Sequence, residues 1–117
     1  MKLWHDKDGD EFRNSDVCWG RSYQPDTDAI DIAKISIRGR FPEKGWGWLE
    51  DTHEMAVITR GEGYALAQDG ERLELKAGDV IYIEPGRKWC WGGNFDMIVP
   101  CSPGFTPQKH HLEEDEQ

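Results

Sequence analysis

The sequence predicts an all-β protein, and three observations carry this prediction. Short segments that alternate apolar and polar residues recur roughly every 8–12 residues, which is typical of β-sandwiches and barrels. Glycine, proline and aspartate separate these segments. No window of about a dozen residues keeps the apolar period of a helix. With 117 residues, of which 37% are hydrophobic, the chain has the size of a single domain with one core.

The N-terminal third divides into an irregular segment and a strand. Residues 1–16 are polar, rich in aspartate and without periodicity, so we expect an arm or loop that docks through Leu3, Trp4 and Phe12. Residues 29–41 alternate between apolar and polar side chains, which predicts a half-buried strand with Ala33, Ile35 and Ile37 on its apolar face. We therefore divide the chain into an N-terminal arm (1–28), a β-barrel (29–107) and an acidic C-terminal tail (108–117).

The central and later segments continue the β pattern. Residues 54–75 predict three short strands, with a first turn at Gly61–Gly63 and a hairpin turn at Asp69–Gly70. Residues 76–86 predict a turn, a β-branched strand and a proline–glycine corner. Residues 89–93 and 95–101 then predict two further strands.

Charge and cysteine content limit the partners and the compartment. The net charge of −9 repels phosphate backbones and anionic lipid heads, which argues against nucleic-acid and membrane partners. No run of about 18 apolar residues predicts a membrane span, and the N-terminus lacks the pattern of a secretion signal. The three cysteines, Cys18, Cys90 and Cys101, form no CxxC motif, so we expect reduced thiols in a cytoplasmic protein.

Two motifs between residues 46 and 103 carry a family resemblance. Glu54 and Gly61 have the spacing of the first cupin motif within "EMAVITRGEG", and Gly78 and Gly86 have the spacing of the second within "AGDVIYIEPG". The segment "VPCSPGFTP" is typical of how such domains close. The chain thus resembles the cupin superfamily, and the resemblance implies a double-stranded β-helix, or jelly-roll barrel. It also implies a homodimer that pairs through the outer face of one sheet and the N-terminal arm.

The histidines that hold a metal in cupins are missing. Depending on the spacing used, the two histidines of the first motif fall on Trp48 and Glu50 or on Gly47 and Leu49; that of the second falls on Trp89. Of the four metal ligands only Glu54 is retained, with Glu50 as a possible second carboxylate, and an indole nitrogen cannot bind a metal. His53 neighbours Glu54 and should point to the opposite face of its strand. His110 and His111 lie in the tail without a partner. We therefore expect no metal and no cofactor.

The tryptophans pair by the two-residue period of a strand. Trp46 shares a face with Trp48, and Trp89 shares one with Trp91. The resemblance implies that Trp48 and Trp89 point inward, which predicts a barrel-mouth pocket that also holds Glu50 and Glu54. The alternative is a dry core of packed indoles, especially at Trp91. Such a pocket suits a sugar-like or cationic ligand, whereas an anion requires a cation such as Arg87.

Three functions remain open. The first is a metal-independent small-molecule binding module. The second is an isomerase- or epimerase-type enzyme with Glu50 and Glu54 as acid and base, assisted by Tyr23, Tyr64 or Tyr82. The third is a divergent metal-dependent cupin enzyme.

Overall fold

The structure is a computed structural model that describes residues 1–113. This part of the chain forms nine strands and two single 3-10 turns, η1 (Asp6–Asp8) and η2 (Pro107–Lys109), so the predicted all-β class is confirmed. The strands are β1 (Asp10–Ser15), β2 (Cys18–Tyr23), β3 (Asp31–Arg38), β4 (Trp46–Leu49), β5 (His53–Ala67), β6 (Arg72–Lys76), β7 (Val80–Ile83), β8 (Trp89–Ser102) and β9 (His110–Glu113).

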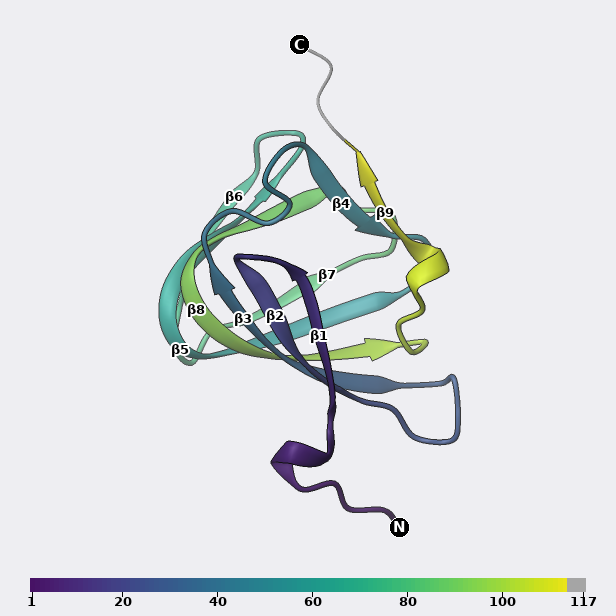
Figure 1. Cartoon of the computed structure of the whole chain (residues 1–117). Helices are drawn as coiled ribbons and strands as arrows, with labels where there is room; N and C mark the ends of the chain where they lie inside the picture. Colours follow the sequence, from purple (N-terminus) through teal and green to yellow (C-terminus); the bar gives the residue numbers. More distant parts are fainter. Residues whose placement is uncertain (114–117) are drawn as a thin grey trace.

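All strand pairs are antiparallel, and they form one sheet that curls around a central space (Figure 1). The order along one path is β1-β2-β3-β8-β4-β9. The strand β5 pairs with the opposite edge of β8 and carries β6 and β7 on its own far edge. This curled arrangement is the jelly-roll barrel expected from the resemblance.

The strands β5 and β8 are longer than the sequence predicts. The expected turn at Gly61–Gly63 lies inside β5, and the two strands expected at residues 89–101 are one strand, β8. The two strands bend at the same level, since Gly61 pairs with Phe95 and Gly63 pairs with Gly93. Gly61 and Gly93 have φ values of 83° and 115°, which favour glycine. The glycines therefore curve the barrel wall and do not end the strands.

The two ends of the chain also differ from expectation. Residues 10–23, expected to lie in an arm, form the hairpin β1–β2 and extend the sheet beyond β3. Trp4 packs edge-on against Tyr23 at 6.5 Å, whereas Leu3 is 78% exposed. Residues 110–113 pair with β4 as strand β9. The last four residues of the expected acidic tail lie outside the described residues.

The core fills the concave side of the sheet. Alternate residues of β5 are buried, so Glu54, Ala56 and Ile58 point inward while His53 is exposed, as the strand period predicts. All three cysteines are buried and unpaired. Within residues 1–113 no helix is long and apolar enough to span a membrane.

Candidate ligand pocket

A cavity of about 470 Å³ opens into the inside of the barrel. Its walls come from both sheet halves and from the segment that leads into β9. Most lining residues are apolar, and the polar ones are Asn14, Cys18, Ser22, Gln24, Asp31, Glu54, Cys101 and His110. Mostly apolar walls with a few convergent polar groups are typical of small-molecule sites.

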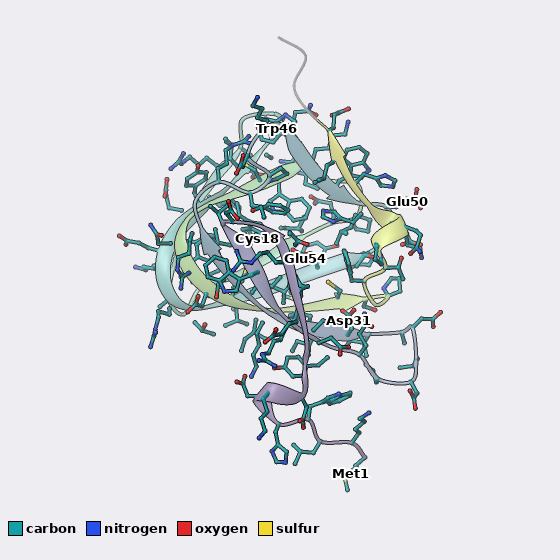
Figure 2. All side chains as sticks on the ribbon, in the orientation of Figure 1. Met1, Cys18, Asp31, Trp46, Glu50 and Glu54 are labelled. Carbon is teal, nitrogen blue, oxygen red and sulfur yellow. The ribbon has the colours of Figure 1, made fainter. Side chains whose placement is uncertain are left out.

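Two acids lie at one level of this cavity, on either side of Cys101. Cys101 on β8 pairs with Asp31 on β3 and with Glu54 on β5, so the three side chains form a row across adjacent strands. The thiol of Cys101 contacts Glu54 Oε1 at 3.9 Å. Figure 2 shows Glu54 inside the curve of the sheet.

The pKa of Glu54 is strongly raised. The side chain is only 8% exposed. Burial, with a smaller contribution from the charge of Asp31, raises its pKa from 4.5 to about 8, although the contact with Cys101 opposes the shift. Glu54 is therefore mostly protonated at neutral pH, so it can donate a hydrogen bond or a proton.

Asp31 is also buried but has two hydrogen-bond donors. The backbone N–H of Phe105 donates to Asp31 Oδ2 at 2.8 Å, and the side-chain amide of Gln24 donates to the same oxygen at 3.3 Å. Burial raises the pKa of Asp31, and these two hydrogen bonds oppose the change. The carboxyl group also fixes the Phe105 segment, which leads to β9.

His110 reaches the cavity from β9 and faces a glycine on β4. A Cβ atom at Gly47 would lie 3.6 Å from His110 Nε2, so the imidazole extends toward the place of a side chain at position 47. Phe105 contacts the imidazole edge-on at 5.6 Å. Burial, and then the neighbouring His111, lower the pKa of His110 below its ordinary 6.5. The ring is therefore neutral at pH 7.

Two of the predicted tryptophans line the cavity. Trp89 and Trp91 share a face of β8, as the strand period predicts, and their rings meet edge-on at 5.8 Å. Both are at least nine-tenths buried. In the described part of the chain, Trp89 Nε1 has no hydrogen-bond partner. The aromatic wall of the pocket is therefore built by β8.

The predicted β4 residues lie outside the pocket. Gly47 and Leu49 line it, whereas Trp46, Trp48 and Glu50 do not. Trp48 stacks on His111 at 5.0 Å, and exposed Glu50 lies 3.4 Å from the same histidine, at the rim of the barrel (Figure 2). Trp46 is buried beside Arg40, whose guanidinium is 5.2 Å from the ring centroid. The motif therefore has its longer spacing, because a shift of one residue reverses the face of every side chain.

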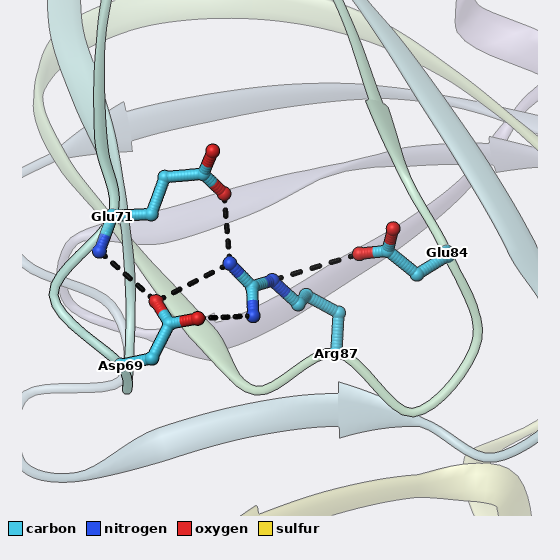
Figure 3. A network of polar contacts seen from close by, with 4 residues as sticks. All are labelled: Asp69, Glu71, Glu84 and Arg87. Atoms are coloured by element: carbon cyan, nitrogen blue, oxygen red, sulfur yellow. Dashed lines mark hydrogen bonds and ion pairs between the residues drawn. The ribbon is translucent and has the colours of Figure 1, made fainter.

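Arg87 also points away from the pocket, into a surface cluster of acids. Its guanidinium lies 2.8 Å from Asp69, 2.7 Å from Glu71 and 3.5 Å from Glu84 (Figure 3). The Arg87 side chain is thus held by ion pairs at the Asp69–Gly70 turn. The ligand contact predicted for Arg87 has no support in this geometry.

The pocket residues do not fit the metal site implied by the fold family. Three of the four ligand positions hold Gly47, Leu49 and Trp89, which offer no ligating atom, and only Glu54 remains. Within residues 1–113 no group of three or more histidine, cysteine, aspartate or glutamate side chains is arranged to hold a metal ion. A transition-metal site normally combines two or three imidazoles with a carboxylate.

Sequence reasoning missed Asp31 and His110. Asp31 begins the half-buried strand as a polar residue. His110 begins a short segment, residues 110–113, whose pairing with β4 is seen only in the structure. The tyrosines considered as proton donors are absent from the cavity lining. Tyr82 is 49% exposed, the buried Tyr23 hydroxyl donates to Asp6, and Tyr64 lies under Arg72.

The comparisons with known proteins agree with this architecture. A family model described as the EutQ-like cupin domain matches residues 43–100. Streptomyces Pac13, solved with uridine, superimposes with a TM-score of 0.84 at 14% identity, covering 100% of this chain and 94% of its own. Pac13 is described as a unique nucleoside dehydratase.

Two further solved structures share the fold. Ectoine synthase from P. lautus has a TM-score of 0.75 at 15% identity, over 100% of this chain and 94% of its own. KdgF from Halomonas sp. has a TM-score of 0.73 at 12% identity, over 92% and 97%. With its barrel, its family-model match and the Glu54 and glycine positions of both motifs, this chain belongs to the cupin superfamily and lacks the usual metal-binding histidines.

Proposed function

We propose that the protein is a small-molecule-binding cupin whose interior pocket takes an uncharged, sugar-like or cationic ligand. The observation that carries this proposal is the lining of the cavity of about 470 Å³: aromatic walls at Trp89 and Trp91, two buried acids, and, among the described lining residues, no lysine or arginine. Indole faces pack against the C–H faces of a sugar or against a cation. The acids then supply hydrogen bonds to hydroxyl or ammonium groups.

The charge of the pocket opposes anionic ligands. An ionised Asp31 would repel a phosphate or carboxylate, protonated Glu54 supplies no positive charge, and Arg87 is held by three surface acids. Uridine, present with Pac13, is an uncharged molecule with a sugar ring and a flat base. A nucleoside or sugar without its phosphate is therefore the ligand class that this lining favours.

We propose that binding needs no metal, because the donor set around Glu54 lacks imidazoles at positions 47, 49 and 89. The alternative of a divergent metal-dependent enzyme predicts a stoichiometric metal in the purified protein. The isomerase-type alternative needs a partner for Glu54 other than Glu50, since Glu50 lies outside the cavity.

Binding can be tested by tryptophan fluorescence with uncharged sugars and nucleosides and with their phosphate esters. We expect uncharged members to quench the emission, with Kd values unchanged by a chelator and at least tenfold lower than those of the matched esters. Trp89→Ala should weaken binding by about 1–3 kcal/mol, since it removes a buried aromatic wall. Trp4→Ala is the control, because Trp4 lies outside the pocket against Tyr23. Exclusive binding of the phosphate esters would contradict the proposal.

We also propose a homodimer formed by the outer face of β3, β8, β5 and β7. The outward side chains of these strands form two cross-strand rows, and several are large, apolar and exposed: Ile32, Met55, Val57, Val80 and Tyr82. A self-complementary apolar face of this kind suits a two-fold interface. The three unpaired cysteines support a cytoplasmic location.

The dimer has a direct measurement. Light scattering should give about twice the chain mass of 13.5 kDa at micromolar concentration. Val57→Asp should give the monomer mass, because it buries a charge at the centre of the face. Leu73→Asp, on β6 away from this face and 44% exposed, should leave the dimer intact. A wild-type mass near 13.5 kDa would refute the dimer.

A further inference from the structure

We propose that Glu54 and His110 are an acid–base pair that moves protons on a ligand held in the pocket, which makes the protein a proton-transfer enzyme. The inference rests on the proposed function, because the ligand must first occupy the cavity. It assigns the base to a residue of the last strand, outside residues 43–100 that match the family model. The corresponding substrate class is an uncharged carbonyl compound with a C–H bond next to the carbonyl group.

His110 reaches the pocket from β9, the strand that pairs with β4. Its Nε2 atom lies 3.6 Å from the place of a Cβ at Gly47, and Gly47 pairs directly with Trp89 of β8. This distance is an ordinary van der Waals contact, so the imidazole lies directly against the position where the longer motif spacing has its first histidine.

Packing fixes the ring of His110 and leaves its nitrogen atoms available to a ligand. The β4–β9 ladder pairs Leu49 with His110, and Phe105 packs edge-on against the ring. In the part of the chain that the structure describes, neither ring nitrogen has a hydrogen-bond partner. An imidazole that is fixed by packing and has a free lone pair is suited to accept a proton from a ligand.

The surroundings of Glu54 favour its protonated form, and those of His110 favour its unprotonated form. The neighbours that face Glu54 are Asp31, Cys101 and Cys18. Burial and the charge of Asp31 raise the pKa of Glu54 to about 8, although the contact with Cys101 opposes the shift. Burial and His111 keep the pKa of His110 below 6.5. Between these values the pocket holds a protonated acid and a neutral base together, which is the pairing that acid–base chemistry needs.

The step balances without any further reactant. His110 Nε2 takes the proton from the carbon next to the carbonyl group while the Glu54 carboxyl gives its proton to the carbonyl oxygen. A C–H bond breaks, N–H and O–H bonds form, and the carbonyl compound becomes an enol. In a sugar-like compound with a hydroxyl group on the carbon that loses its proton, this enol is an enediol. Return of the proton from the imidazolium to the former carbonyl carbon, and of the proton of the second hydroxyl group to the Glu54 carboxylate, gives the isomeric hydroxy carbonyl compound and restores both residues.

The test uses 5-nitrobenzisoxazole, an uncharged flat probe that a base opens by removing its C–H proton. The electron pair forms a nitrile, the N–O bond breaks, and a coloured phenolate is released whose oxygen can accept a hydrogen bond from Glu54. Quenching of tryptophan fluorescence first shows whether the full-length protein binds the probe. We expect turnover above the buffer rate, with a bell-shaped pH profile that falls below the pKa of His110 and above about pH 8.

Matched variants assign the two roles. His110→Asn should lower kcat roughly 10²-fold, as expected for loss of a general base. His5→Asn is the control, because His5 is exposed and outside the pocket, and its kcat should stay within about threefold of wild type. Glu54→Gln keeps a hydrogen-bond donor, so it should keep most of the neutral rate and lose the fall at high pH.

The outcomes separate the inference from the proposed function. A bound probe that turns over no faster than in buffer, or equally well in His110→Asn, would overturn the acid–base pair and leave the binding pocket standing. A rate that rises above pH 8 would make ionised Glu54 the base and would also overturn it. Absence of any quenching would overturn the pocket for flat uncharged ligands, and the inference with it.

Discussion

Glu54→Gln is expected to stabilise the protein by roughly 3–5 kcal/mol at pH 8 and above. The folded-state pKa of Glu54, about 8, lies above its ordinary value of 4.5. The stability contributed by this group is therefore complete below pH 4.5 and is lost as the pH rises toward 8, by about 1.4 kcal/mol per pH unit. Glutamine does not ionise, so the variant escapes this loss.

Urea unfolding at pH 5 and at pH 8.5 gives the free energy of unfolding of the wild type and of Glu54→Gln. The difference between the two proteins should be small at pH 5 and large at pH 8.5. Glu50→Gln is the matched control, since Glu50 is exposed and outside the cavity. A variant that is no more stable than wild type at pH 8.5 would mean that Glu54 ionises freely in the folded protein.

Phe95→Ala is expected to destabilise the protein by about 3–5 kcal/mol. Phe95 is 1% exposed, and its ring lies edge-on to Trp91 at 6.0 Å. It also covers Gly63, where an added Cβ would be 2.7 Å from the Phe95 ring. Truncation would leave a cavity at the bend of β5 and β8, where the glycines have no side chains to fill it.

Chemical denaturation at pH 6 gives the size of this effect. Leu73→Ala provides the comparison, because Leu73 on β6 is 44% exposed and its truncation should cost only about 0.5 kcal/mol. If the two substitutions cost the same, the Phe95 ring does not sit in the closed core described above.

The sequence predicts the all-β class because alternation and turn residues are local signals. Asp69–Gly70 and the corner at Gly86 behave as expected. Gly61 and Gly93 do not, since a glycine marks a turn or a bend equally well from local sequence. Only the neighbouring strand distinguishes the two, because pairing across the bend keeps each strand continuous.

The candidate site is predicted only in part. Glu54, Trp89 and Trp91 follow from the motif and the strand period, and all three line the cavity. The inward face of β4 does not follow from the sequence, because two motif spacings fit it; the structure has the longer spacing, with Gly47 and Leu49 in the cavity lining. His110 needed the pairing of residues 110–113 with β4, a contact about 60 residues apart in sequence that local patterns do not report.

The shared bend of β5 and β8 has a consequence for how the molecule loses its structure. Each of these strands runs through both halves of the barrel, and they pair with each other from His53–Ser102 to Ala67–Trp89. Loss of β5–β8 pairing in one half of the barrel therefore destabilises the pairing of the same two strands in the other half. We therefore expect the barrel to unfold as one cooperative unit, since neither half can lose its structure while the other half keeps the native β5–β8 register.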